Sequence, residues 1–214
     1  MAETKLDYKK RDKTLYSATQ KPALVDVPDM LFIAIDGKGA PVSELFQESI
    51  QVLYSLSYAI KMSKMSGQQP DGYFEYVVPP LEGLWWMGSG VTFDASKPQE
   101  WLWRLMIRQP EFVTEQVFEQ VVKKCKTKNP DLMLIDNARF ISFKEGPCVQ
   151  IMHIGDYSQE QASIDKIEQF ISGNNMTADM NDIRKHHEIY LSDPRKGDPD
   201  KIKTILRIPV KSNI

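Results

Sequence analysis

The residue with the clearest chemical potential is Glu188, which lies in the segment HHEIYLS at 186–192. Alternation along a strand would place Ile189 and Leu191 on a buried face, and Glu188 with Tyr190 on the opposite face. If that second face is open to solvent, Glu188 is an ordinary surface charge. If it lines an aromatic cavity, burial raises the pKa of the carboxyl group, which becomes an anchor for a cation or a base that activates water.

The aromatic content favours a cavity. The chain of 214 residues contains 4 Trp, 8 Tyr, 9 Phe and 10 Met, and the tryptophans gather near its middle at Trp85, Trp86, Trp101 and Trp103. Aromatic rings bring a large apolar area with definite geometry to ligand pockets. Because Trp85 and Trp86 are adjacent on a predicted strand, they face opposite sides, so one belongs to the core and the other could line a pocket.

A second candidate is Tyr157, which closes the turn GDY just before a predicted helix. It could pack over the start of that helix, or its hydroxyl group could donate to a substrate or a water molecule. The three histidines are His153, His186 and His187. On a strand His186 shares the face of Glu188 while His187 points away, and hydrogen-bonded structural roles are favoured over a metal site.

The sequence lacks the motifs that are typical of several kinds of catalytic and cofactor-binding site. Neither GxxxxGK[ST] nor GxGxxG occurs, so no glycine-rich loop is predicted to hold a phosphate group. A nucleophile elbow and a CxxC pair are also absent, and Cys125 and Cys148 are predicted to be reduced thiols. We therefore expect no metal and no cofactor.

Net charge and hydropathy limit the classes of partner that the chain is expected to bind. The chain has 27 Lys and Arg against 29 Asp and Glu, a formal net charge of -2, which gives no electrostatic footprint for nucleic acid. No apolar run reaches the roughly 18 residues that a membrane span needs, and the first twenty residues are polar and charged. We expect a cytoplasmic protein that binds neither nucleic acid nor membranes, and its oligomeric state stays open.

The elements that would position these residues occur twice in the same order, strand, helix, strand, strand. The first set is predicted at 30–36, 43–63, 73–78 and 82–87, and the second at 149–154, 158–172, 187–192 and 205–210. We expect a single α+β domain over 1–214, with a first repeat at about 30–92 and a second at about 148–210. Each repeat would bury the exposed sheet face of the other.

A helical insertion is predicted between the repeats, at about 97–128. Ser96 with Gln99 resembles a capping box, apolar residues at 101, 102, 105 and 106 follow at helical spacing, and a second apolar stripe runs from 112 to 125. Another capping box, Ser158 with Gln161, is expected to begin the helix of the second repeat.

Four segments together carry a family resemblance. They are VPPLEGLWW (78–86), WLWRLMIRQPEFVT (101–114), VQIMHIGDYSQE (149–160) and HHEIYLSDPRKGDPDKIKTILRIPV (186–210). With them, the chain from about residue 31 to 210 resembles the stand-alone GyrI-like small-molecule-binding proteins, which are related to the effector-binding domains of multidrug-responsive transcription regulators. The resemblance implies a duplicated β-α-β-β fold of the SHS2 type with a ligand cleft between its halves.

The same resemblance implies roles for individual residues. In related domains an acidic residue at the position of Glu188 meets flat cationic ligands in an aromatic pocket. A branch with these Trp-rich and HHEIYLSDP-type signatures is associated with hydrolytic opening of the cyclopropane ring in DNA-alkylating cyclopropanoid natural products. By this likeness Glu188 would bind or activate the attacking water and Tyr157 would help to hold it or the substrate. The residues expected to contact the substrate are Trp103, Trp85 or Trp86, Tyr190, His186, Phe140 and Met152.

Three functions remain open at this point. The chain could be a cofactor-independent hydrolase of cyclopropanoid, drug-like alkylators. It could instead bind hydrophobic, aromatic or cationic small molecules without chemistry, sequestering them or passing them to a partner. A third reading, also implied by the family, is inhibition of a DNA-processing enzyme such as gyrase.

Overall fold

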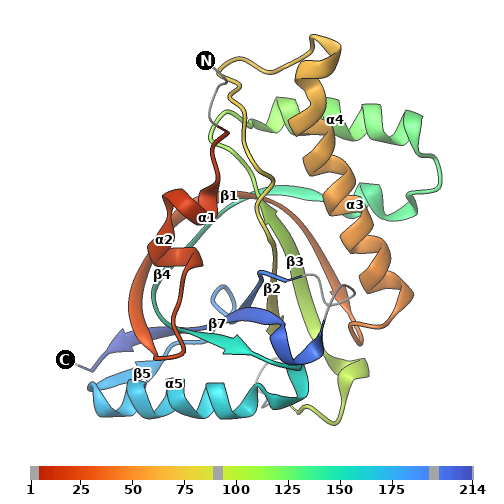
Figure 1. The fold of residues 1–214 in the computed structure, drawn as a ribbon. Helices are drawn as coiled ribbons and strands as arrows, with labels where there is room; N and C mark the ends of the chain where they lie inside the picture. Colours follow the sequence, from red (N-terminus) through yellow and green to blue (C-terminus); the bar gives the residue numbers. More distant parts are fainter. Residues whose placement is uncertain (1–4, 89–93, 193–197, 214) are drawn as a thin grey trace.

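The computed structural model describes residues 5–88, 94–192 and 198–213 (Figure 1). The helices are α1 (Tyr8–Arg11), α2 (Lys13–Tyr16), α3 (Glu44–Lys61), α4 (Glu115–Lys128) and α5 (Gln161–Gly173). The strands are β1 (Ala23–Lys38), β2 (Leu81–Trp86), β3 (Leu102–Arg108), β4 (Arg139–Ile154), β5 (Met176–Ala178), β6 (His186–Tyr190) and β7 (Lys203–Ser212). Short 3₁₀ turns are η1 (Met62–Ser66), η2 (Pro98–Glu100), η3 (Met133–Asn137), η4 (Tyr157–Gln159) and η5 (Pro199–Lys201). The chain is α+β, as the sequence predicts.

The strands form a barrel-like antiparallel sheet. Its order is β4-β1-β3-β2-β6-β7, and a further pairing between β4 and β7 closes the circle, while the short β5 adds to β7. Within the first half the strands lie in the order β1-β3-β2, and within the second in the order β4-β7-β6. The two halves meet at two seams, β1 with β4 and β2 with β6. In a closed barrel every strand has two neighbours, so its backbone polar groups are satisfied.

The prediction of a strand at 73–78 is wrong. This segment makes a single isolated bridge, from Tyr76 to Leu6, and the partner strands of β2 are instead β3 and β6. Its aromatic residues, which suggested a strand, pack in a cluster around Phe112. The two prolines that follow lack the N–H groups that a sheet ladder needs.

The helix predicted at 96–110 is also wrong, because these residues contain β3. This strand lies between β1 and β2, where both of its faces are covered, and Trp103, Leu105, Met106 and Ile107 are all fully buried. A strand buried on both faces reads as a continuous apolar run, which periodicity cannot distinguish from a buried helix. The helical insertion is therefore confined to α4 and η3, and β3 becomes the last strand of the first half.

The remaining predicted elements are found close to their expected positions, apart from details at their ends. The helix α5 begins at Gln161, after η4, and the expected capping box at Ser158 is replaced by Asp156, whose side chain accepts a hydrogen bond from the Ser158 N–H. The predicted end of the first repeat, at about residue 92, lies outside the described residues. No helix in the described ranges is long and apolar enough to cross a membrane.

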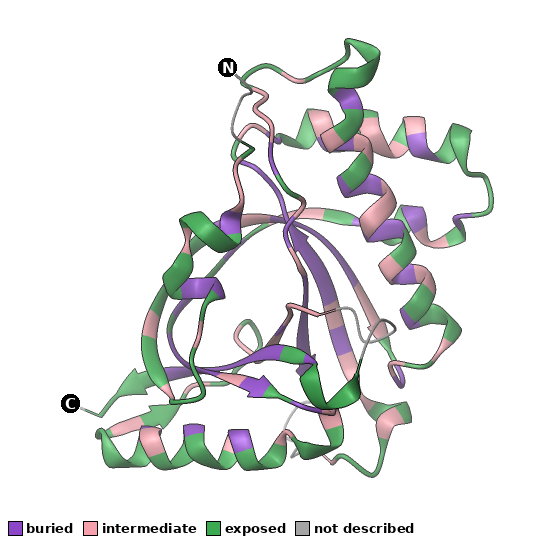
Figure 2. Cartoon of the chain, in the orientation of Figure 1, coloured by how far each residue is buried: buried purple, intermediate pink, exposed green. Residues whose placement is uncertain are grey.

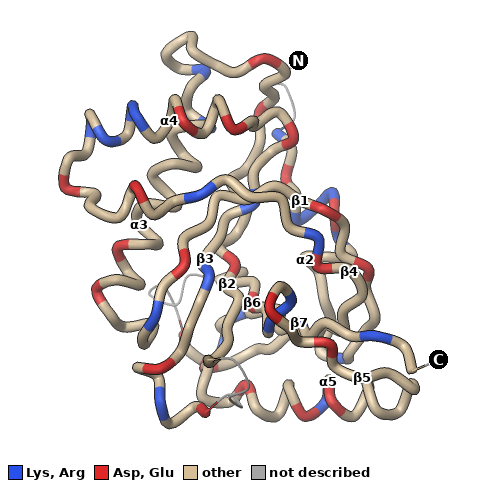
Figure 3. Tube along the Cα trace, turned by 180° about the vertical axis from the view of Figure 1, so that it is seen from behind, with Lys and Arg blue, Asp and Glu red and all other residues tan. Residues whose placement is uncertain are grey.

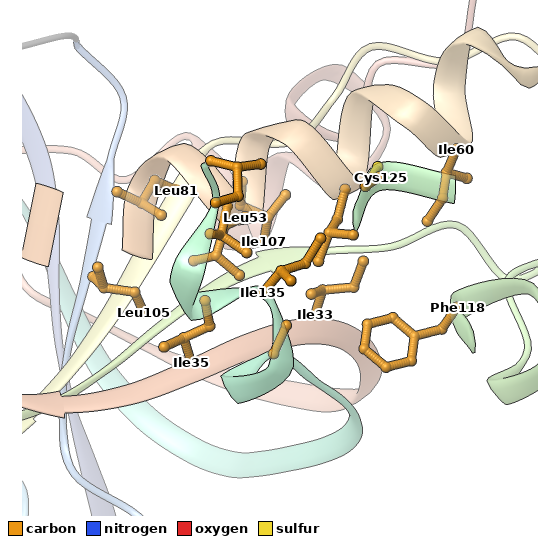
Figure 4. Packing of buried hydrophobic residues seen from close by; sticks show 14 of the residues in the cluster. Ile33, Ile35, Leu53, Ile60, Leu81, Leu105, Ile107, Phe118, Cys125 and Ile135 are labelled. Carbon is orange, nitrogen blue, oxygen red and sulfur yellow. The ribbon is translucent and has the colours of Figure 1, made fainter. Parts of the chain in front are cut away.

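The three longer helices, α3, α4 and α5, cover the outer face of the barrel in two separate places. Helix α3 packs on β1 and β3 with α4 beside it, and Figure 4 shows the apolar side chains between them, among them Ile33, Leu53 and Ile107. Helix α5 packs on β4 and β7 in a second cluster that includes Ile167 and Leu206. Most residues of the central strands are buried (Figure 2). The helices expose the sides that face away from the sheet. The strip of outer face where β2 meets β6 lies between the two clusters.

The interior of the barrel contains buried charged residues. His187 lies between Glu82 and Glu145, at 3.0 and 2.9 Å, and Arg207 contacts Glu145 at 3.0 Å. Burial opposes the charged form of His187, but the nearby Glu145 and Glu82 carboxylates raise its pKa. Burial would likewise raise the pKa of Glu145, yet the charges of His187 and Arg207 lower it. Opposite charges face each other in this cluster, which offsets the cost of burying them, so removing one of them would leave a buried charge unpaired and destabilise the fold.

The short helix α2 completes this polar cluster. The Tyr16 hydroxyl donates to Glu82 at 3.0 Å, Arg207 donates to the carbonyl oxygen of Leu15, and the Gln150 amide donates to that of Thr14. Buried donors and acceptors left without partners would cost free energy, so α2 belongs to the folded structure of the barrel, and α1 adds the buried Tyr8 to its inner cluster.

A prediction concerns Gly37 of β1, which lies opposite Trp103 of β3. A Cβ atom at Gly37 would lie 2.1 Å from the Cη2 atom of the buried Trp103 ring. Gly37→Ala should therefore lower the free energy of unfolding by about 1–3 kcal/mol, measured by urea denaturation. Gly173→Ala is the matched control, because nothing lies within 4 Å of a Cβ there. Equal stability of the two variants would contradict the packing described.

Candidate functional site

The candidate site lies at the seam between the two halves. The register of β2 against β6 places Gly83 opposite Glu188 and Trp85 opposite His186. Paired residues of antiparallel strands share a face, so these four residues lie on the outer face, with Tyr190 two residues beyond Glu188. The predicted faces of β6 are confirmed: Ile189 is buried on the inner side, and His187 points into the interior cluster.

A chain of hydrogen bonds leads to the Glu188 carboxylate. The indole N–H of Trp85 donates to the Tyr190 hydroxyl oxygen at 3.0 Å, and that hydroxyl donates to Oε2 of Glu188 at 2.8 Å. The Nε2 atom of His186 lies 3.3 Å from Oε1. The Glu188 side chain is 13% exposed. Glu188 is thus mostly buried, but a small part of its side chain remains accessible to solvent.

Gly83 makes this arrangement possible. A Cβ atom at this position would lie 2.9 Å from the Tyr190 hydroxyl oxygen and 3.0 Å from Nε1 of Trp85. Both distances are shorter than a normal contact, so only glycine leaves the Tyr190 ring room to cross β2 and meet the Trp85 indole.

Tyr157 lies beside these residues, on η4. Its ring meets the Tyr190 ring edge to face, with centroids 6.3 Å apart. The turn is held by Asp156, which caps η4, and by His153, whose Nε2 atom contacts the Asp156 carbonyl oxygen at 3.1 Å. Burial, followed by the charges of Glu188 and Glu160, raises the pKa of Tyr157 to about 12. Tyr157 therefore keeps its proton at neutral pH and can donate a hydrogen bond.

Glu160 is a residue of this site that the sequence analysis missed. It stands between η4 and α5, three residues after Tyr157, and its Oε1 atom is buried without a hydrogen-bond partner among the described residues. Burial, the nearby charge of Glu188 and that of Asp156 raise the pKa of Glu160 to about 9. The spacing to Tyr157 at a helix start was visible in the sequence, but the packing of that start against β6 was not.

The other residues expected to contact a substrate are dispersed. Trp103 is fully buried, lies over Gly37 and donates to the Gly39 carbonyl oxygen at 3.2 Å, so it has no face free for stacking. Phe140 stacks on Phe118 of α4. Met152 belongs to the inner-face cluster, on the opposite side of the sheet from Glu188.

Trp85 and Trp86 face opposite sides, as predicted. Trp85 is 5% exposed, stacks on Phe46 and belongs to the Glu188 side. Trp86 borders a cavity of about 220 Å³ together with Leu84, Met87, Arg104, Asp182, Ile183 and Lys185. A larger hollow of about 600 Å³ lies near the N-terminal helices, beside Tyr73 and Phe74. Glu188 lines neither of these two cavities.

Figure 3 shows Lys and Arg interspersed with Asp and Glu over the whole trace. Within the described ranges no group of three or more His, Cys, Asp or Glu side chains is arranged to hold a metal ion. The candidate site offers the carboxyl groups of Glu188 and Glu160, the phenols of Tyr157 and Tyr190, and the imidazole of His186.

A prediction follows for Glu160. Because its pKa is raised in the folded chain, the unfolded chain loses this proton first, and folding becomes less favourable as pH rises from about 4.5 towards about 9. Glu160→Gln should remove this cost. Its thermal midpoint should equal that of the unmodified protein below pH 4.5 and exceed it at pH 8 by at least about 2–4 °C. Glu168→Gln, an exposed change on the same helix, should show no such difference. Parallel pH curves for Glu160→Gln and the unmodified protein would contradict the raised pKa.

Comparisons with known proteins agree with this fold. A hydrolase from Listeria innocua is 44% identical, with a TM-score of 0.89, and the match covers 97% of this chain and 100% of that chain. An uncharacterized conserved protein from Listeria innocua is 46% identical, with a TM-score of 0.92 and the same coverage. The EcmrR C-terminal domain shares the fold at 11% identity and a TM-score of 0.56, over 90% of this chain and 98% of that chain. No curated protein matches. Residues 20–211 match the GyrI-like small molecule binding domain, and the chain therefore belongs to the GyrI-like family.

Proposed function

We propose that the protein is a cofactor-independent hydrolase that opens the cyclopropane ring of flat, DNA-alkylating cyclopropanoid compounds, with Glu188 as the base. The observation that carries this proposal is the Glu188 carboxylate, held at the seam of the two halves by Tyr190 and His186 with 13% of its side chain exposed. It would act in the cytoplasm on small molecules, which would detoxify them.

The chemistry suits the groups at the site. A strained cyclopropane conjugated to a carbonyl group is already electrophilic, so the protein needs to hold the flat body and deliver a polarised water molecule. A carboxylate that takes the proton from this water contributes typically about 10²–10⁴-fold to the rate. Tyr157 keeps its proton and would hold the water or the substrate by a hydrogen bond.

We expect a flat ligand to reach Glu188 by movement of neighbouring side chains, because only 13% of the Glu188 side chain is exposed. Tyr157 is the ring best placed to move, because it stands on a turn of three residues and meets Tyr190 only edge to face. Trp85 is fixed between Phe46 and the Tyr190 hydroxyl, so we expect it to form the stationary wall of the opened pocket. The relationship to the hydrolase from Listeria innocua, 44% identical over 97% of this chain, supports hydrolysis as the reaction type.

Binding without chemistry is the second candidate. The proximity of Glu160 and Glu188 to the Tyr157 and Tyr190 rings favours it, because carboxylates and aromatic faces together attract flat cations. Under this alternative the protein would protect or sequester a compound and leave it unchanged.

Glu188→Gln distinguishes the two functions. Glutamine keeps the size of the side chain but cannot take a proton, so the variant should bind a cyclopropanoid alkylator with affinity close to that of the unmodified protein and hydrolyse it at least about 100-fold more slowly. Mass spectrometry of the compound after incubation measures the addition of water. Glu168→Gln is the control for an equal change of net charge. Equal turnover by Glu188→Gln would refute the assignment, and an unchanged compound with the unmodified protein would favour binding alone.

A further inference from the structure

We propose that Glu160 is the general acid of this site, and that it protonates the substrate oxygen that gains electron density while Glu188 removes the proton from the attacking water. This inference rests on the proposed hydrolytic function. It adds a second carboxyl group with the opposite role, and it restricts the substrates to cyclopropanes conjugated with a carbonyl oxygen that can accept a proton.

The positions of the two carboxyl groups support opposite roles. Glu188 lies on β6, where its carboxylate accepts a hydrogen bond from the Tyr190 hydroxyl at 2.8 Å and lies 3.3 Å from Nε2 of His186. Glu160 lies on the facing turn at the start of α5, where its Oε1 atom is buried and accepts no hydrogen bond from the described residues. Donors favour an ionised carboxylate, whereas burial without donors favours the neutral acid.

Among the described residues, the charges that act on Glu160 are those of two carboxyl groups, Glu188 and Asp156. On its own turn are Asp156 and Tyr157, and β6 contributes Glu188, Tyr190 and His186. From β4, His153 uses both ring nitrogens on Ser163 and the Asp156 carbonyl oxygen. Within the described ranges no Lys or Arg forms an ion pair with Glu160. Two carboxyl groups that share a low-dielectric site do not both ionise, and the one without donors keeps its proton.

The acidity of the available donors also favours Glu160. Its pKa is raised to about 9 by burial, Glu188 and Asp156, whereas burial and the two carboxyl groups raise the pKa of Tyr157 to about 12. A general acid is most effective when its pKa lies near the working pH, because it must be protonated and still give up its proton readily. Tyr157 is better suited to orienting the substrate or the water.

The step balances without a cofactor. The water oxygen forms a bond to a cyclopropane carbon, and the C–C bond that breaks sends its electron pair through the conjugated system to the carbonyl oxygen. That oxygen takes the proton of Glu160, and Glu188 takes a proton from the water. The products are a phenol or enol carrying a hydroxyalkyl group, and the proton on Glu188 then returns to Glu160 through water.

Infrared spectroscopy tests the protonation without any substrate. At pH 7 the unmodified protein should show the carbonyl stretch of a neutral carboxyl group, which is absent from Glu160→Gln and retained in the exposed control Glu168→Gln. Glu160→Gln should fold, since it is expected to be the more stable protein at this pH. Absence of the band from the unmodified protein, or its persistence in Glu160→Gln, would overturn the assignment of the acid while leaving Glu188 as the base.

Turnover of a cyclopropanoid alkylator tests the catalytic role. The rate with the unmodified protein should fall above pH 9, and Glu160→Gln should lose this alkaline limb together with about 10²–10⁴-fold of the rate. Unchanged turnover by Glu160→Gln would disprove the acid role even if the infrared band is present. If the unmodified protein shows the band but never adds water to the compound, the hydrolytic function itself is wrong and the acid role with it.

Discussion

The pairing of β2 with β6 is the constraint on which the site depends. It is one of the two seams that join the halves, and its register sets Gly83 directly opposite Glu188. Only in this register does the missing side chain of one strand make room for the ring that binds the carboxylate of the other. A shift of one residue would exchange the faces of β6 and send Glu188 into the barrel in place of His187.

Strand β6 thus carries two neighbouring polar residues in opposite environments. His187 is fully buried between Glu82 and Glu145, where each charge faces an opposite one and the cluster has a structural role. Glu188, one residue later, meets phenol and imidazole donors and keeps a small exposed edge. Because side chains alternate across a strand, a single short segment supports both the inner cluster and the outer site.

The faces of β6 were predictable from alternation, since Ile189 and Leu191 mark its apolar side. Alternation also placed Trp85 and Trp86 on opposite sides, but did not show which of them belongs to the core. The strand β3 could not be predicted from the sequence, because burial on both faces removes the alternation that identifies a strand. The site was predictable where its residues belong to one strand, as Glu188, Tyr190 and His186 do. Glu160 reaches it from another element, and the burial that sets its protonation depends on how α5 packs, which spacing in the sequence does not report. The expectation that Trp103 stacks on a ligand failed to take account of Gly37, over which its ring lies.

The two short helices before the sheet have a consequence for where the folding unit begins. The match to the family starts at residue 20, yet the backbone of Thr14 and Leu15 and the hydroxyl of Tyr16 satisfy Gln150, Arg207 and Glu82 inside the barrel. A chain cut at the family boundary would take one hydrogen bond each from Arg207, Gln150 and Glu82 inside the barrel. The folded structure of this protein therefore extends to residues before the segment that matches the family.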